Sequence, residues 1–363
     1  MKNIKLLLIL FISVIFNSCS SEKIKKPESD LNIGNDDHLE LINKYVANFP
    51  NKTNIAIAII NENGTNYYGI LRENDTLKSI INKDKVYEIG SISKVFTSTL
   101  LSYNIYKKTI NLDDKLGSFF NFELNEGENI TLQQLANHTS GLARIPSNMP
   151  IKSMISKNPY KQYTSENIEE FLKEKVKLKY KTGEKNKYSN LGAGLLGYIL
   201  TKKNNKSYEE LLQEIICKPL QMTNTTTLRE KIKEENLVKG LNKKGKETSN
   251  WDFTDALVGA GGIKSSVVDL EKFVRKNFEN DSIYNLTHQK TYAVNDKMEI
   301  GLGWHIFGGD SVLWHNGGTG GYRSCMAFNK DKKTSVIVLS NVSSFNKKSN
   351  NIDKLCFELI KNN

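Results

Sequence analysis

This sequence contains few of the residues on which several protein classes depend. It has four cysteines and five histidines among 363 residues. The cysteines are widely spaced, and the histidines lack the spacing of a zinc-binding motif. The sequence therefore predicts neither a disulfide framework nor a metal site, and we expect no cofactor. It shows no internal repeat.

The chain also lacks a long hydrophobic run and a concentrated basic segment. The apolar run at residues 6–16 is shorter than the ~20 residues that cross a bilayer as a helix. The formal net charge is +11, but the lysines are scattered and often stand beside Glu or Asn. Scattered lysines favour a solvated surface, so we expect no nucleic-acid partner. A hydrophobic content of 38% suits one large domain or two interleaved lobes.

The N-terminus has the pattern of an export signal. Lys2 and Lys5 precede the apolar run, which ends in Phe16-Asn17-Ser18-Cys19. This ending resembles a bacterial lipoprotein cleavage site, although its first two residues differ from the usual ones. We therefore expect a signal peptide over residues 1–18, lipidation of Cys19 and a polar tether over residues 19–37. An ordinary signal peptide cut nearby is the alternative.

The remaining residues, 38–363, have strand patterns at both ends and helical patterns in the middle. A helix followed by a hairpin that turns at Asn63-Gly64 is expected at the start, and strands are expected in "GLGWHIF", "SVLWH", "YRSCMAF" and "TSVIVLSN". An amphipathic helix is expected from about residue 347 to residue 360. The predicted architecture is an α/β lobe (about 38–90 and 255–363) with an inserted, mainly helical lobe (about 91–254).

Ser91 and Lys94 form the best candidate for a nucleophile and its base. Ser-x-x-Lys occurs three times, but only here does it run from a strand-like segment through Gly90 into an apolar helical pattern. Residues three apart on a helix share a face. A buried lysine with a lowered pKa can accept the proton of a serine hydroxyl. The alternative is a helix cap at Ser91 followed by a surface lysine.

Two further segments contain residue types that are suited to the same chemistry. Tyr188-Ser189-Asn190 precedes a helix rich in small residues and can present a phenol and an amide. His315-Asn316-Gly317 ends a strand-like segment and is followed by further glycines, which permit close approach of the backbone to a ligand.

In this order, the three segments resemble the active-site motifs of the serine β-lactamase-related family, which contains class C β-lactamases, D-alanyl-D-alanine carboxypeptidases and esterases. Supporting segments are "LANHTSGL", "CKPLQMTNTT", "GAGGIKSSVVDLEKF" and "GLGWHI". The resemblance implies a β-lactamase/transpeptidase-like fold of the α/β (α+β) class, with an antiparallel sheet flanked by N- and C-terminal helices.

The resemblance also implies roles for individual residues. Ser91 would be acylated, Lys94 would be its base partner, and Tyr188 would relay protons. Asn190, His315, Asn316, Gly317 and Gly318 would bind substrate, with the backbone N–H groups of Ser91 and Gly318 forming an oxyanion hole.

The third motif departs from the Lys-Thr-Gly of typical class C β-lactamases. A histidine with a pKa of ~6.5 replaces a permanent cation, which weakens carboxylate recognition. Arg144 and Arg323 are candidates to replace it. The sequence does contain Lys181-Thr182-Gly183, but it lies just before Tyr188, so we expect a turn there and not the third motif.

The function predicted from these observations is an exported, membrane-anchored serine hydrolase on the periplasmic or cell-surface face. It would act as a monomer on β-lactams or on D-amino-acid peptides of the cell wall. An esterase or amidase of the same family is one alternative, and a non-catalytic ligand-binding lipoprotein is another.

Overall fold

The structure is a computed structural model that describes residues 36–307 and 311–363. The predicted signal peptide, Cys19 and nearly all of the tether lie outside these residues. Within them, no helix is both long and apolar enough to span a membrane.

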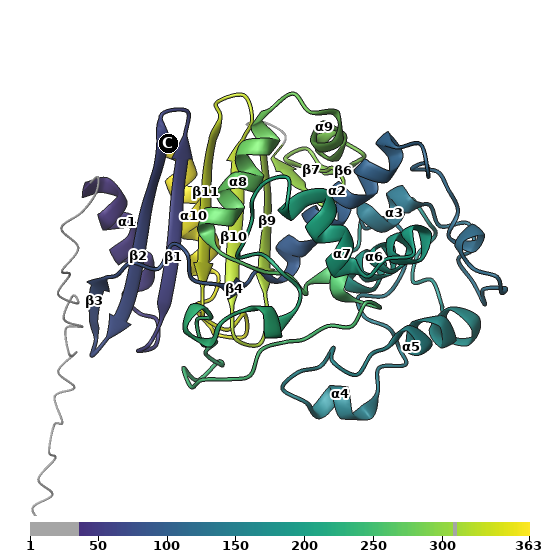
Figure 1. Cartoon of the computed structure of the whole chain (residues 1–363), viewed down its shortest axis with the longest axis horizontal. Helices are drawn as coiled ribbons and strands as arrows, with labels where there is room; N and C mark the ends of the chain where they lie inside the picture. Colours follow the sequence, from purple (N-terminus) through teal and green to yellow (C-terminus); the bar gives the residue numbers. More distant parts are fainter. Residues whose placement is uncertain (1–35, 308–310) are drawn as a thin grey trace, which may run out of the picture.

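Strands from both ends of the chain form one antiparallel sheet, as Figure 1 shows. In spatial order, the nine strands are β3 (Thr76–Ser79), β2 (Gly64–Glu73), β1 (Asn54–Asn61), β11 (Thr334–Ser340), β10 (Arg323–Asn329), β9 (Val312–Gly318), β8 (His305–Phe307), β7 (Met298–Ile300) and β6 (Tyr292–Asn295). A separate pair joins β4 (Tyr87–Glu88) to β5 (Lys264–Ser265). The predicted α/β class with an antiparallel sheet is confirmed.

The alternation of side chains along β1 explains why both faces of the sheet are covered. Ile55, Ile57 and Ile59 point into a core shared with two terminal helices, whereas Ala56 and Ala58 belong to the core on the other face. The terminal helices are α1 (Asp36–Val46) and α10 (Asn351–Lys361).

Helix α8 covers the other face, and the helices of the middle of the chain form a lobe beside the sheet (Figure 1). These helices are α2 (Ser93–Tyr106), α3 (Leu132–Ala136), α4 (Ile151–Ile155), α5 (Ser165–Glu170), α6 (Asn190–Asn204), α7 (Tyr208–Leu212), α8 (Val267–Phe278) and α9 (Ser282–His288). Helix α2 is buried almost all round, and its Phe96 stacks on Phe273 of α8 with ring centroids 4.1 Å apart. Ser91 lies in a single 3₁₀ turn, Gly90–Ile92, directly before this central helix.

Some predicted boundaries were wrong by a few residues. The first hairpin pairs Asn61 with Gly64, so its turn is Glu62-Asn63. The last helix begins at Asn351 and not near residue 347. The strands β6 and β7 were not anticipated, because segments of four and three residues carry little periodicity.

Close backbone contact fixes the 3₁₀ turn Gly90–Ile92 against the end of β9. We call it the nucleophile turn, because it contains the predicted nucleophile Ser91. A Cβ added at Gly317 would stand 1.9 Å from the carbonyl oxygen of Ile89 and 2.5 Å from the hydroxyl of Ser324. That same hydroxyl donates a hydrogen bond of 2.8 Å to the Ile89 carbonyl. Glycine is therefore required at position 317 for the sheet to approach the turn.

We expect Gly317→Ala to lower the free energy of unfolding by about 1–3 kcal/mol or more, because the overpacked backbone must shift. Urea denaturation measures this change. Gly192→Ala in the first turn of α6 is a matched control, since its Cβ would meet nothing closer than 3.4 Å. Equal stability of the two variants would show that the contact at Gly317 is unimportant.

Candidate active site

Lys94 lies at the centre of a hydrogen-bonded cluster. It is 2% exposed. Its Nζ lies 3.1 Å from Ser91 Oγ, 2.9 Å from Asn190 Oδ1 and 2.7 Å from the carbonyl oxygen of Ala260. The three partners come from the nucleophile turn, the start of α6 and the loop before β5. The fold thus brings together residues that are far apart in the sequence.

No carboxylate among the described residues forms an ion pair with Lys94. Burial lowers its pKa well below the usual value for lysine, and the positive charge of Arg144 lowers that pKa further. The site therefore favours the neutral amine.

The ring of Tyr188 lies among cationic and aromatic groups. Lys94 Nζ is 4.7 Å from the ring centroid, and the Arg144 guanidinium carbon is 5.1 Å from it. The His138 ring is 4.4 Å away between centroids. The Tyr188 hydroxyl is hydrogen-bonded to Ser91, and burial raises the pKa of the phenol. Tyr188 is therefore protonated at neutral pH and within reach of the serine hydroxyl.

Local structure holds the Tyr188–Asn190 segment in place. Ser189 caps α6 by accepting a hydrogen bond from Gly192 N, and its hydroxyl donates to the carbonyl of Ala143. The backbone N–H of Asn190 donates to the carbonyl of Arg144 over 2.9 Å. Arg144 is therefore positioned through its backbone, while its side chain remains exposed beside Tyr188.

His315 faces the cluster as a neutral ring. It is 1% exposed, and its Nδ1 lies 2.6 Å from the Asn316 carbonyl, which can only accept. Nδ1 therefore carries the hydrogen, which leaves Nε2 as a buried acceptor without a hydrogen-bond partner among the described residues. Burial, followed by the charges of His305 and Lys94, lowers the pKa of His315 well below 6.5.

The side chains of Asn316 and Arg323 bind a carboxylate outside the cluster, whereas from the sequence we expected both to bind substrate. Because side chains alternate along a strand, Asn316 points away from the face that carries His315. Its amide donates to Asp353 of α10 over 3.0 Å, and the Arg323 guanidinium binds the same carboxylate. Both side chains are thus engaged in anchoring α10 to the sheet.

The glycines after His315 bring two backbone segments together. Gly90 has a left-handed φ of +52°, and a Cβ there would stand 2.5 Å from Gly318 N. The backbone nitrogens of Ser91 and Gly318 therefore belong to neighbouring segments.

The Lys-Thr-Gly triplet lies elsewhere. Its Gly183 has φ of +79° and donates its N–H to the Thr139 carbonyl. It occupies a turn, as expected.

Sequence reasoning missed three contributors to the site. His138 and His305 surround the cluster, and burial lowers the pKa of His305 to about 4. The Tyr160 side chain is hydrogen-bonded to Asn190. The two histidines lie inside the supporting segments "LANHTSGL" and "GLGWHI", but nothing in the sequence marks Tyr160.

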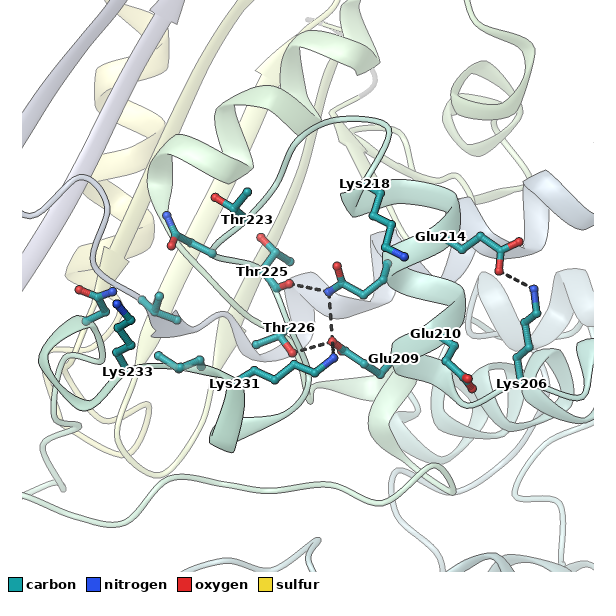
Figure 2. Close-up of a pocket in the computed structure, with 15 residues that line it drawn as sticks. Lys206, Glu209, Glu210, Glu214, Lys218, Thr223, Thr225, Thr226, Lys231 and Lys233 are labelled. Carbon is teal, nitrogen blue, oxygen red and sulfur yellow. Dashed lines mark hydrogen bonds and ion pairs between the residues drawn. The ribbon is translucent and has the colours of Figure 1, made fainter.

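A separate, polar cavity lies away from this cluster. Its volume is about 870 Å³, and none of the predicted site residues lines it. Figure 2 shows two ion pairs among its charged groups, Lys206 with Glu214 and Lys231 with Glu209. It contains no nucleophile paired with a base.

An antiparallel sheet, a buried central helix and a serine–lysine–tyrosine cluster between them define a serine hydrolase of the penicillin-recognising fold. The beta-lactamase family model matches residues 42–356, and the chain belongs to this family.

The similar proteins include both peptidases and β-lactamases. The chain is 27% identical to the D-alanyl-D-alanine-carboxypeptidase/endopeptidase AmpH of Escherichia coli K12, over 85% of each protein. It is 24% identical to a beta-lactamase of Providencia stuartii, over 69% of this chain and 65% of that protein.

Solved structures support the fold. A class C beta lactamase aligns with a TM-score of 0.73 at 20% identity, over 92% of this chain and 100% of that one. The beta-lactamase/D-alanine carboxypeptidase of Pseudomonas syringae aligns with a TM-score of 0.72 at 20% identity, over 90% and 98%.

Proposed function

We propose that the protein hydrolyses an amide or ester through an acyl-enzyme on Ser91. The observation that carries this proposal is the environment of Lys94. A neutral amine has two N–H groups and one lone pair. The oxygens of Ala260 and Asn190 can only accept, so they take the two N–H groups. The lone pair is then left for the hydroxyl hydrogen of Ser91.

In the proposed first step, Ser91 Oγ attacks the substrate carbonyl carbon while its proton passes to Lys94. The carbonyl oxygen becomes an oxyanion, which the backbone N–H groups of Ser91 and Gly318 stabilise. Tyr188, protonated and hydrogen-bonded to Ser91, donates a proton to the leaving nitrogen or oxygen as the bond to it breaks. Lys94 restores the tyrosine proton.

In the second step, water attacks the acyl-enzyme. The Tyr188–Lys94 pair takes a proton from the water and returns one to Ser91 Oγ, which releases the acid. We propose β-lactams or D-amino-acid peptides as substrates, because the similar proteins named above are β-lactamases and a D-alanyl-D-alanine peptidase. Comparing rates on nitrocefin, a D-Ala-D-Ala peptide and a p-nitrophenyl ester separates these substrates from simple esters.

Substrate carboxylates would meet Arg144 in this proposal. The guanidinium is exposed beside Tyr188 and has no ion pair with a described carboxylate, whereas Arg323 is bound to Asp353. Neutral His315 contributes an acceptor in place of a cation, which disfavours tight binding of an anionic substrate at that position.

We expect a fluorescent penicillin or a fluorophosphonate to label the wild type and not Ser91→Ala. Gel fluorescence measures the labelling. Lys181→Ala, in the exposed turn, is the control and should label as the wild type does, because that lysine is outside the cluster. Equal labelling of Ser91→Ala and wild type would refute the acyl-enzyme.

The pH dependence of kcat/KM should depend on the charge of Arg144. Activity requires neutral Lys94, so the rate falls as pH drops below the pKa of that lysine. Removing the neighbouring cation raises this pKa, so Arg144→Gln should move the acid limb to higher pH. Rates on an uncharged ester between pH 5 and 9 measure the shift.

Arg144→Lys is the matched control, because it keeps a positive charge and should keep the acid limb near that of the wild type. An unchanged or lower-shifted limb in Arg144→Gln would contradict the assignment of Lys94 as the base.

We further propose that the protein is exported and anchored through lipidated Cys19, which rests on the N-terminal sequence alone. Incorporation of labelled palmitate into the full chain should occur in the wild type and be lost in Cys19→Ala. Incorporation by both forms would place the lipid elsewhere.

A further inference from the structure

Two buried cysteines lie in the core between the sheet and the terminal helices. Cys325 is in β10 and Cys356 is in α10, and both side chains are fully buried. Both belong to the apolar cluster that α1 and α10 form with one face of the sheet. In the structure both are free thiols. Because they lie far apart along the chain, the sequence gives no sign that they meet.

The two thiols are in direct contact. The Cys325 side chain is hydrogen-bonded to Cys356, and the Cys356 thiol donates to the carbonyl oxygen of Val336 over 3.4 Å. Since the hydrogen of Cys356 points to Val336, its sulfur is left to accept the hydrogen of Cys325. The two sulfurs therefore face each other, and a disulfide requires them to approach to ~2.05 Å.

An ion pair beside the thiols fixes the register of α10 on β10. Arg323 precedes Cys325 by two residues and shares its strand face. Asp353 precedes Cys356 by three residues and shares its helix face. The Arg323 guanidinium donates to the Asp353 carboxylate over 3.1 Å. The helix is thus held in the register that brings the two cysteines together.

Burial decides when these thiols can react. The thiolate is the nucleophile in disulfide exchange, and burial, together with the neighbouring thiol, raises the pKa of Cys325 well above its usual value. In the folded protein both sulfurs are therefore unreactive and out of reach of solvent. Before α10 packs on the sheet, the same thiols are exposed and have the ordinary pKa of ~8.5.

We propose that Cys325 and Cys356 form a disulfide that joins β10 to α10 when the protein folds in an oxidising compartment. The oxidant is an external disulfide, either a small molecule or a protein. One cysteine thiolate attacks it and releases one thiol, and the second cysteine then attacks the mixed disulfide and releases the other thiol. Two cysteine thiols and one external disulfide thus give one internal disulfide and two external thiols. The inference rests on the proposed export, because exported proteins meet such oxidants.

The bond secures the helix that anchors the strand of the third motif. Asp353 of α10 accepts a hydrogen bond from Asn316, the neighbour of His315. Cys356 lies about one turn further along the same helix. The disulfide therefore keeps α10, and with it the anchor of Asn316, in place when the protein is heated.

The test refolds the reduced full chain in two buffers, one with oxidised glutathione and one with dithiothreitol. Each product is then unfolded and alkylated with N-ethylmaleimide, and its peptides are mapped by mass spectrometry. In the oxidised product, we expect the peptides of Cys325 and Cys356 to be linked to each other and free of alkylation. We expect the melting temperature of this product to exceed that of the reduced one by about 5 °C.

Cys217 provides the matched control, because it is also buried and no cysteine lies beside it in the described part of the chain. Cys217→Ala should keep both the linked peptides and the rise in melting temperature. Cys356→Ala should lose both and leave Cys325 alkylated. If Cys356→Ala does not fold, Cys325→Ala makes the same comparison, and the peptide map of the wild type decides even without either variant.

Three results would overturn the proposal. They are alkylation of both Cys325 and Cys356 in the oxidised wild type, a link from either of them to Cys217, and equal melting temperatures of the two products. Each can occur while Ser91 is still labelled by a fluorescent penicillin and Cys19 still incorporates palmitate. Loss of either of those labels would instead reject the proposed function or the proposed anchor and leave the linked peptides unchanged.

Discussion

The site depends on one constraint, the burial of Lys94 without a carboxylate partner in the part of the chain that the structure describes. A buried ammonium is costly unless it is paired, so the fold favours the neutral amine. Two carbonyl-type oxygens, from Ala260 and Asn190, fix the orientation of that amine toward Ser91. Both come from elements distant in the sequence. In the proposed mechanism, the packing of α2 against α6 and the loop before β5 is therefore also what activates the serine.

None of the ionisable groups described next offsets the cost of a charged Lys94. Arg144 lies near Tyr188 and opposes protonation of Lys94, while His138, His305 and His315 are all held neutral by burial. A site with His315 in the third motif thus contains fewer fixed cations than one with a lysine there. In the proposed function, recognition of an anionic group falls to the exposed Arg144.

Much of the fold followed from periodicity and turn residues. The N-terminal helix, the first hairpin and the strands before and after the glycine-rich loop were expected near their observed places. Short strands such as β6 and β7 were missed because a few residues carry no period. Helix α5 continues from Glu170 to Lys175 as a wider helical turn, a change of helix type that the pattern of apolar residues does not reveal.

By itself, the sequence determined the order and spacing of the Ser91, Tyr188 and His315 segments, because local patterns of small, apolar and polar residues are written along the chain. Only the tertiary structure decided their electrostatic state and direction. Burial sets the pKa of Lys94, and the strand pleat turns Asn316 toward Asp353 and away from the site. The contacts of Lys94 with Asn190 and Ala260 also exist only in three dimensions, since contacts between distant residues leave no periodic signal.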